Sequence, residues 1–171
     1  MFLVSSASVV GFSGSRSPSS ESVSAVRAAV GAVAPSSSVF VGCARGVDAA
    51  VRSLVPSARV FRVSDVGFRG RGAFAARSVV CVDAVAAAGG VWVSFPASPC
   101  PVGLVPSSRS SRCFSGGGSG TWASLAYAIG LGVPCCVFLP SGVECPSGWP
   151  LGWSAGGWFV FVPPARQLSL F

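Results

Sequence analysis

Short apolar runs alternate with longer segments of helical periodicity along this chain. Runs rich in Val and Phe are expected to form buried strands at residues 7–12, 38–41, 58–63, 91–95, 134–139 and 157–162. Helices are expected from Pro18 to Pro35, from Asp48 to about Leu54, and over residues 73–88 and 122–131. This alternation predicts an α/β fold of the Rossmann-like type, with three α/β/α layers and a mostly parallel sheet.

Details of the pattern add four expectations. Val23, Val26, Val30 and Val33 recur at helical spacing and are expected to form one buried stripe. Residues 96–115, rich in Pro and Ser, are expected to be irregular, and residues 157–162 are expected to form an edge or final strand. Asp83 is expected to pair with an Arg. The late tryptophans, which are Trp149, Trp153 and Trp158, would complete the core or stack on bases.

The chain has 171 residues, which suits one domain over residues 1–162 followed by an extended tail at 163–171. Its net charge is +7, and all 12 of its basic residues are Arg. Guanidinium groups favour bidentate contacts with phosphate or carboxylate, so the charge indicates phosphate-bearing partners. The alternative is a protein that is merely basic.

Seven Cys and no His are present, without a C-x-x-C pair. No zinc-ligand spacing is visible, so neither a metal nor a cofactor is expected. Reduced, mostly buried thiols are typical of a cytoplasmic protein. No signal peptide is recognisable, and glycines and Pro134 divide the uncharged stretch 113–143. Its apolar helix of about ten residues is too short to cross a membrane.

Three glycine-rich loops, at residues 11–16, 42–48 and 116–121, each precede a helix. The loops of a parallel sheet meet at the carboxyl edge, where backbone N–H groups and Arg side chains suit a phosphate. The candidate binding residues are Gly14, Ser15, Arg16, Gly42, Arg45, Gly46, Asp48, Arg77, Gly116, Gly117, Gly118, Ser119, Gly120 and Thr121. Further phosphate contacts are expected from Arg69, Arg71, Arg109 and Arg112.

Each candidate has a plainer interpretation. The glycines would only permit sharp turns between strand and helix. Thr121 would place its hydroxyl on a phosphate or cap its helix. Asp48 would hold a ribose hydroxyl, orient Arg45, or cap a helix. Arg77 would face the ligand edge or be a solvated surface charge.

The three loop motifs resemble those of the Smf/DprA–LOG superfamily over roughly residues 9–139. The matching residues are Gly14-Ser15-Arg16, Ala44-Arg45-Gly46-Val47-Asp48 and Gly116-Gly117-Gly118-Ser119-Gly120-Thr121. The resemblance implies a Rossmann-like fold that binds nucleotides or single-stranded DNA, with the DprA-like DNA-processing proteins as the nearest branch.

The chain departs from the LOG branch where that branch has its chemistry. LOG phosphoribohydrolases carry P-G-G-x-G-T-x-x-E, whose final Glu is catalytic. Here Gly116 stands at the Pro position and Ser124 at the Glu position. Because His is absent and acids are few, no other catalytic set is visible. A non-enzymatic protein is therefore expected, and an N-glycosidic hydrolase is disfavoured.

The last residues, Gln167-Leu168-Ser169-Leu170-Phe171, resemble the pentapeptide by which bacterial replication and repair proteins bind the DNA polymerase sliding clamp. That resemblance assigns clamp binding to Gln167, Leu168, Leu170 and Phe171, with apolar side chains filling subsites and the Gln amide forming a hydrogen bond. The alternative is an apolar tail that packs on the domain.

Together these features predict a DprA-like protein that binds single-stranded DNA and is recruited to the sliding clamp in replication, recombination or repair. A sensor of a free nucleotide or nucleotide-derived messenger is the alternative. The uncharged stretch 113–143 also leaves a homo-oligomer open.

Overall fold

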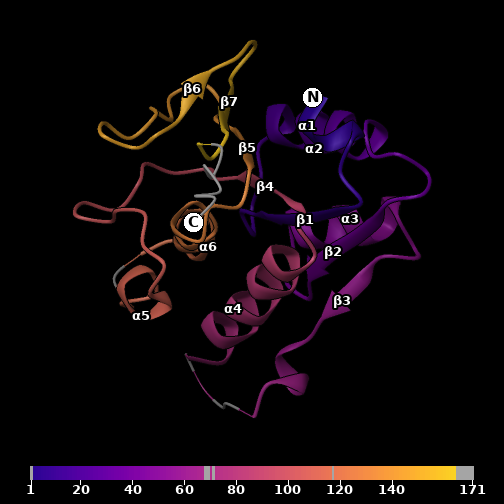
Figure 1. Cartoon of the computed structure of the whole chain (residues 1–171), viewed down its shortest axis with the longest axis horizontal. Coiled ribbons are helices and arrows are strands. Elements are labelled where there is room, and N and C mark those ends of the chain that lie inside the picture. Colours follow the sequence, from indigo (N-terminus) through magenta and orange to yellow (C-terminus); the bar gives the residue numbers. More distant parts are fainter. Residues whose placement is uncertain (1, 68–69, 71, 117, 165–171) are drawn as a thin grey trace, which may run out of the picture.

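The computed structural model describes residues 2–67, 70, 72–116 and 118–164, and it contains one mixed sheet flanked by helices (Figure 1). The strand order within these residues is β3-β2-β1-β4-β5-β7-β6. The strands are β1 (Val9–Gly14), β2 (Ser38–Gly42), β3 (Arg59–Phe61), β4 (Val91–Phe95), β5 (Cys135–Phe138), β6 (Gly152–Trp153) and β7 (Trp158–Phe161). The first five are parallel, whereas β7 runs antiparallel to β5 and β6 antiparallel to β7.

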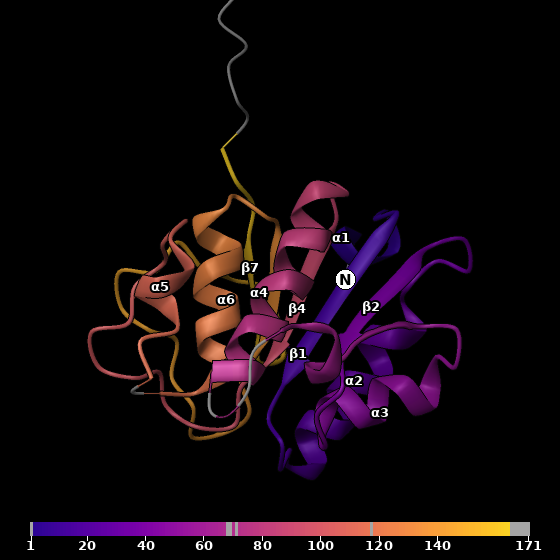
Figure 2. The same cartoon turned by 90° about the horizontal axis from the view of Figure 1, so that it is seen from below.

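Helices cover both faces of the sheet, which confirms the predicted Rossmann-like three-layer α/β fold. They are α1 (Phe2–Ser5), α2 (Ser20–Gly31), α3 (Val47–Leu54), the 3-10 turn η1 (Val63–Asp65), α4 (Gly72–Ala87), α5 (Ser110–Cys113) and α6 (Gly120–Gly130). α2 and α3 pack together on one face, and α4 lies beside α6 on the other (Figures 1 and 2).

Alternating side chains of the strands supply two separate cores. Val39 and Val41 pack beneath α2 and α3, whereas Phe40 between them packs beneath α4. In β4, Trp92 likewise packs in the core that holds Phe40, whereas its neighbours Val91 and Val93 pack in the other core. Because successive strand residues point to opposite faces, a nearly continuous apolar strand buries side chains on both sides.

Strand β1 runs two residues beyond its predicted end. Ser13 and Gly14 pair with Ser94 and Phe95 of β4, so Gly14 is a strand residue rather than a loop residue. A Cβ at Gly14 would meet the side chain of Val47. This glycine therefore allows α3 to pack closely against β1.

The predicted valine stripe of α2 is wrong in part. Of its four members only Val26 is fully buried, and the other buried positions are Ser22, Ala25 and Ala29. The face turned to the sheet carries small side chains, so the helix approaches closely. Helix α2 begins after Ser19, whose hydroxyl accepts a hydrogen bond from the Ser22 N–H at 3.2 Å.

Several short elements also depart from expectation. Residues 96–115 contain the short helix α5, and α1 precedes the first strand. Strand β7 is the last strand, but it is not at the edge, because β6 pairs with it on its outer side. Two-residue strands such as β6 have too little apolar periodicity to be recognised in a sequence.

Two predictions about side chains resolve clearly. Among the described residues Asp83 forms no ion pair with an Arg; its Oδ1 accepts a hydrogen bond from the Tyr127 hydroxyl at 2.7 Å. Burial and this contact raise the pKa of Tyr127 to about 12. Trp149 completes the core edge-on to Trp122, whereas Trp153 is 71% exposed.

All seven cysteines are free thiols, and the consecutive residues Cys135 and Cys136 of β5 are buried in different cores on opposite faces of the sheet. Burial raises the pKa of both, which keeps them protonated and poorly nucleophilic at neutral pH. Their contribution is therefore to the core.

Candidate functional site

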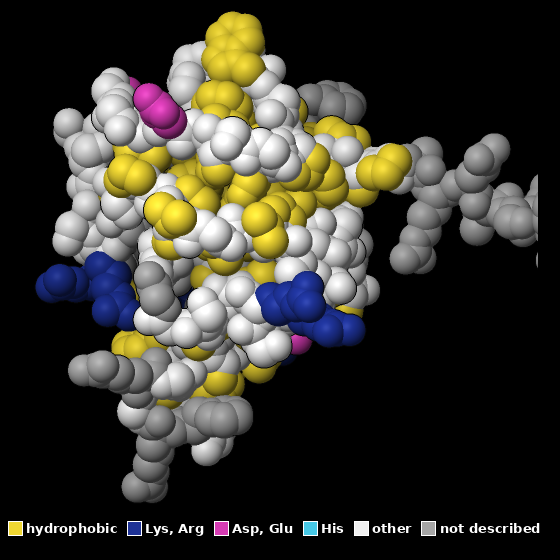
Figure 3. Space-filling model, turned by 90° about the vertical axis from the view of Figure 1, so that its left-hand side faces the viewer, with side chains coloured by type: hydrophobic (Ala, Val, Ile, Leu, Met, Phe, Trp, Pro, Cys, Tyr) yellow, Lys and Arg dark blue, Asp and Glu magenta, His cyan; other side chains and the backbone are white. Residues whose placement is uncertain are grey.

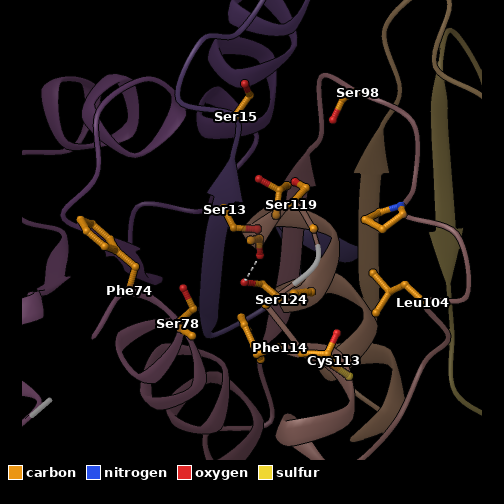
Figure 4. Close-up of a pocket in the computed structure, with 18 of the residues that line it drawn as sticks. Ser13, Ser15, Phe74, Ser78, Ser98, Leu104, Cys113, Phe114, Ser119 and Ser124 are labelled. Carbon is orange, nitrogen blue, oxygen red and sulfur yellow. Dashed lines mark hydrogen bonds between the residues drawn. The ribbon is translucent and has the colours of Figure 1, made fainter. Parts of the chain in front are cut away.

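A cavity of about 880 Å³ opens at the carboxyl ends of β1 and β4. Strand order reverses between these two strands, since β2 and β3 extend to one side of β1 and β5 to the other side of β4. Loops diverge at such a switch point and leave a crevice where ligands of parallel sheets bind. Figure 4 shows the cavity with serine hydroxyls between walls of different origin.

Two walls face each other across this opening. The short-loop wall comprises residues 13–16, which end β1 and begin the loop after it, and residues 44 and 48, which follow β2. The long-segment wall comprises residues 97, 98, 101–104, 112–116, 118 and 119, which lie between β4 and α6. The first turns of α4 and α6 complete the lining with Phe74, Arg77, Ser78, Thr121 and Ser124.

The structure brings most of the predicted site residues together. Those lining the cavity are Gly14, Ser15, Arg16, Asp48, Arg77, Gly116, Gly118, Ser119, Gly120 and Thr121. Gly42, Arg45 and Gly46 do not line it. Gly117 and the tail residues Gln167, Leu168, Leu170 and Phe171 lie outside the described residues, as do Arg69 and Arg71.

Gly42 and Gly46 serve the packing of the short-loop wall. A Cβ on Gly42 would overlap the guanidinium of Arg77. Gly46 has φ +73°, and its Cβ would meet the backbone of Ser15 and Arg16. The two loops therefore approach within hydrogen-bond distance, and the Val47 N–H donates to the Ser15 carbonyl at 3.0 Å. Arg45 itself is exposed.

Arg77 and Asp48 form a buried ion pair beneath the short-loop wall, with Nη1 and Oδ2 3.3 Å apart. The same oxygen accepts a hydrogen bond from the Ala44 N–H at 3.1 Å. Burial raises the pKa of Asp48, and Arg77, the Ala44 N–H and Arg52 oppose that rise. Asp48 is thus the counterion of Arg77, and its hydrogen bond to the Ala44 N–H fixes the loop between β2 and α3.

This pair corrects two sequence-based alternatives. Arg77 is only 8% exposed and is not a solvated surface charge. Asp48 lies within α3, after the N-cap residue Gly46, so it does not cap that helix with its side chain. The Nε of Arg77 is buried with no hydrogen-bond partner among the described residues.

The N-terminus of α6 faces the cavity without a side-chain cap. Ser119 is the N-cap residue, and its hydroxyl makes no capping hydrogen bond. Thr121 lies inside the first turn and is therefore not the cap. The first N–H groups of a helix lack partners within it and carry a partial positive charge, so this end of the cavity attracts anions.

Arg16 and Arg112 supply the other positive charges of the lining. The Arg16 guanidinium carbon lies 4.7 Å from the ring centroid of Phe74. Arg16, Arg77 and Arg112 face one acid, Asp48, whose charge Arg77 already balances. The cavity is consequently basic.

Several lining residues were not identified from the sequence. They are Ser13, Phe74, Ser78, Ser98, Leu104 and Phe114. An isolated Phe in an Ala-rich helix has the pattern of a core residue, and serines are too common in this chain to stand out. Only the folded arrangement identifies them.

The lining offers little for acid–base chemistry. Ser124, at the position of the LOG catalytic Glu, is buried, and its hydroxyl donates to the Gly120 carbonyl at 2.8 Å. Within the described residues, no cluster of His, Cys, Asp and Glu is large enough to hold a metal ion. The groups presented are donors and cations, which suit binding.

None of the described helices is long and apolar enough to cross a membrane. Comparisons of the chain with family models, with curated proteins and with solved structures give no match. What the cavity binds is therefore inferred from its own geometry and chemistry.

Proposed function

We propose that this protein binds single-stranded nucleic acid, seating a phosphate-bearing nucleotide in the switch-point cavity. The observation that carries the proposal is the meeting of Arg16, Arg112 and the uncapped α6 N-terminus at one basic hollow. Guanidinium groups and helix N–H groups are strong donors to phosphate oxygens. The DprA-like resemblance of the loop motifs points to the same ligand.

The size of the cavity agrees with a nucleotide. At about 880 Å³ it lies in the range of small-molecule sites, which is about 300–1,000 Å³. Serine hydroxyls of its lining, such as those of Ser13 and Ser119, offer both donors and acceptors for a sugar.

The distribution of Arg favours a strand over a single nucleotide. Arg45 follows the lining residue Ala44, and Arg109 precedes α5, so both lie next to the cavity in the chain, and both are exposed. Figure 3 shows two separate groups of basic side chains on the face that carries α5. A strand leaving the cavity would bring further phosphates within reach of such charges.

Fluorescence anisotropy with a labelled single-stranded oligonucleotide at two salt concentrations tests the proposal. Several phosphate contacts make affinity fall steeply with salt. Arg16→Ala is expected to weaken binding, whereas Arg27→Ala, an exposed Arg of α2 outside the cavity lining, is the matched control. Equal affinity of the two variants would count against the cavity as the binding site.

The second candidate is a sensor of a free nucleotide or nucleotide-derived messenger. The observation in its favour is that the cavity is bordered on one side by the long-segment wall and on the other by α4. A cavity bordered on both sides suits a ligand of limited size. Mononucleotide competitors in the same assay separate the two candidates. Ready displacement with a shallow salt dependence would favour the sensor.

The proposal includes recruitment to the polymerase sliding clamp and a cytoplasmic location. The clamp contact rests on the sequence Gln167-Leu168-Ser169-Leu170-Phe171, and coupling to DNA binding would raise its effective concentration. Replacing Gln167 and Phe171 by Ala is expected to abolish co-elution with a bacterial clamp, whereas Ser169→Ala is expected to preserve it. Persistent co-elution of the double variant would remove this part of the proposal.

A further inference from the structure

Phe74 is an exposed aromatic ring on the wall of the cavity. It retains 41% of its accessible surface, whereas the second phenyl ring of the lining, Phe114, is half-buried and packs edge-on to Tyr127. An exposed aromatic ring inside a hollow offers a ligand an apolar surface to cover.

Helix α4 fixes where this ring lies. Phe74, Arg77 and Ser78 are three and four residues apart, so they share one side of the helix, and all three line the cavity. Ala73, their neighbour, is buried in the core at 2% exposure. The ring is therefore carried by a rigid element. Figure 4 shows it on the opposite side of the cavity from Leu104.

Arg16 holds a defined position over the ring. Its guanidinium carbon lies 4.7 Å from the ring centroid, within the range of a cation–π contact. The preceding residue, Ser15, donates its N–H to the Phe95 carbonyl at 2.9 Å, which anchors the loop that carries Arg16. A cation–π contact does not consume the guanidinium N–H groups, so they stay free for an anion.

We infer that Phe74, together with Arg16, forms a stacking subsite for a nucleobase. This inference rests on the proposed nucleotide-binding function and assigns the two ends of the ligand. The base lies against the α4 wall, and the phosphate lies toward Arg16 and the α6 N-terminus. A phenyl ring has no hydrogen-bonding groups, so the subsite accepts any base without discriminating among them.

Isothermal titration of the full-length chain with two probes tests the assignment. Adenosine 5′-monophosphate carries a base, whereas ribose 5-phosphate carries the same phosphate and sugar without one. Phe74→Ala is expected to lower affinity for the nucleotide by about 5- to 150-fold, the usual range for loss of one base–aromatic stack. Affinity for ribose 5-phosphate is expected to stay the same.

Val80→Ala is the matched control, because Val80 is an exposed apolar residue of α4 that does not line the cavity. Phe74→Trp is expected to retain nucleotide binding and to add indole fluorescence that the nucleotide quenches. If Phe74→Ala fails to fold, quenching in Phe74→Trp decides the question. A nucleotide that binds this variant without changing its fluorescence would overturn the inference.

The remaining outcomes separate this inference from the proposed function. Equal losses for both probes in Phe74→Ala would show that the ring only positions the phosphate site, and unchanged binding of both would show that it has no role. If the wild-type chain binds none of the three probes (the oligonucleotide, the nucleotide and the sugar phosphate), the proposed function itself is removed. An abasic oligonucleotide that binds as well as an intact one would also overturn the base assignment.

Discussion

The two walls of the cavity are held in place by different means. The short-loop wall is fixed by backbone contacts, such as the hydrogen bond from Val47 N–H to the Ser15 carbonyl, and by the buried Arg77–Asp48 pair. In the long-segment wall, two indole N–H groups donate to the Ser98 and Leu104 carbonyls at 2.8 and 3.2 Å, and the buried Cys113 anchors the part near α5. Val102 of this wall is fully exposed. The first wall is preorganised, and the second is attached at separate points.

The difference has a chemical consequence for binding. Preorganised donors lose little entropy when a ligand arrives, so the short-loop wall is suited to fixing the charged part of a ligand. A wall attached at a few points can adjust to ligands of different length. Substitutions that disturb one wall at a time, compared by their effects on stability and amide exchange, test this difference.

The largest effect is expected from Asp48→Ala. It leaves the Arg77 charge buried without its counterion, and breaking a buried pair in this way costs about 3–5 kcal/mol of unfolding free energy. Urea denaturation measures the loss. Glu144→Ala, which removes an exposed acid, is the control and is expected to change stability little. A small loss in Asp48→Ala would show that the pair does not stabilise this wall.

Two glycine substitutions compare the walls directly. Gly46 and Gly116 both have positive φ, at +73° and +87°, but only a Cβ at Gly46 would meet neighbouring backbone. Gly46→Ala is expected to cost about 3 kcal/mol from strain and overpacking together, and Gly116→Ala about 1–2 kcal/mol from strain alone. Thermal and urea unfolding provide the values. Equal costs would mean that the two loops are equally free to move.

Stability is expected to depend on pH through Asp48. Its folded pKa is raised above the ordinary value of 3.8, so between these two values the folded chain binds more protons than the unfolded one. The unfolding free energy from this group therefore falls as pH rises through that window, by at most about 1.4 kcal/mol per pH unit. The slope is measured as the difference between wild type and Asp48→Asn. A difference of the opposite sign would mean that Arg77 outweighs burial.

The most local effect is expected from Trp149→Phe, which removes the hydrogen bond to the Leu104 carbonyl together with part of an indole ring buried in the core. That bond contributes about 1 kcal/mol. Amide hydrogen exchange is expected to accelerate in residues 99–105 and to stay unchanged in residues 13–16. Faster exchange in both segments would show that the walls open together.

Local signals in the sequence were sufficient for much of the fold. Strand β4 has the predicted bounds, Val91–Phe95, because a continuous apolar run between a glycine pair and a proline has few alternatives. The convergence of three loops at one edge followed from the parallel arrangement alone. The fold class needed only the alternation of strands and helices.

The finer structure of the site depended on contacts between distant residues. Arg77 and Asp48 are 29 positions apart, and nothing in either segment indicates that they pair. The burial of Ser22 and Ala25 in place of Val23 depends on how closely α2 approaches the sheet. The position of Phe74 in the helix pattern is that of a core residue, and its exposure at the cavity is seen only in the folded structure. Such features arise from tertiary packing, which periodicity does not encode.

The Ser13 hydroxyl, which lines the cavity, is hydrogen-bonded to the hydroxyl of Ser94, 81 positions away in the chain. Neighbouring parallel strands so distant in sequence pair only when a long loop closes, and the entropy lost on closure slows folding. The unfolded chain consequently has no cavity, and a ligand that fits it binds the native state alone. By mass action each tenfold excess over the dissociation constant adds about 1.4 kcal/mol to stability. The midpoint of thermal denaturation therefore reports occupancy directly, whatever the chemical identity of the ligand.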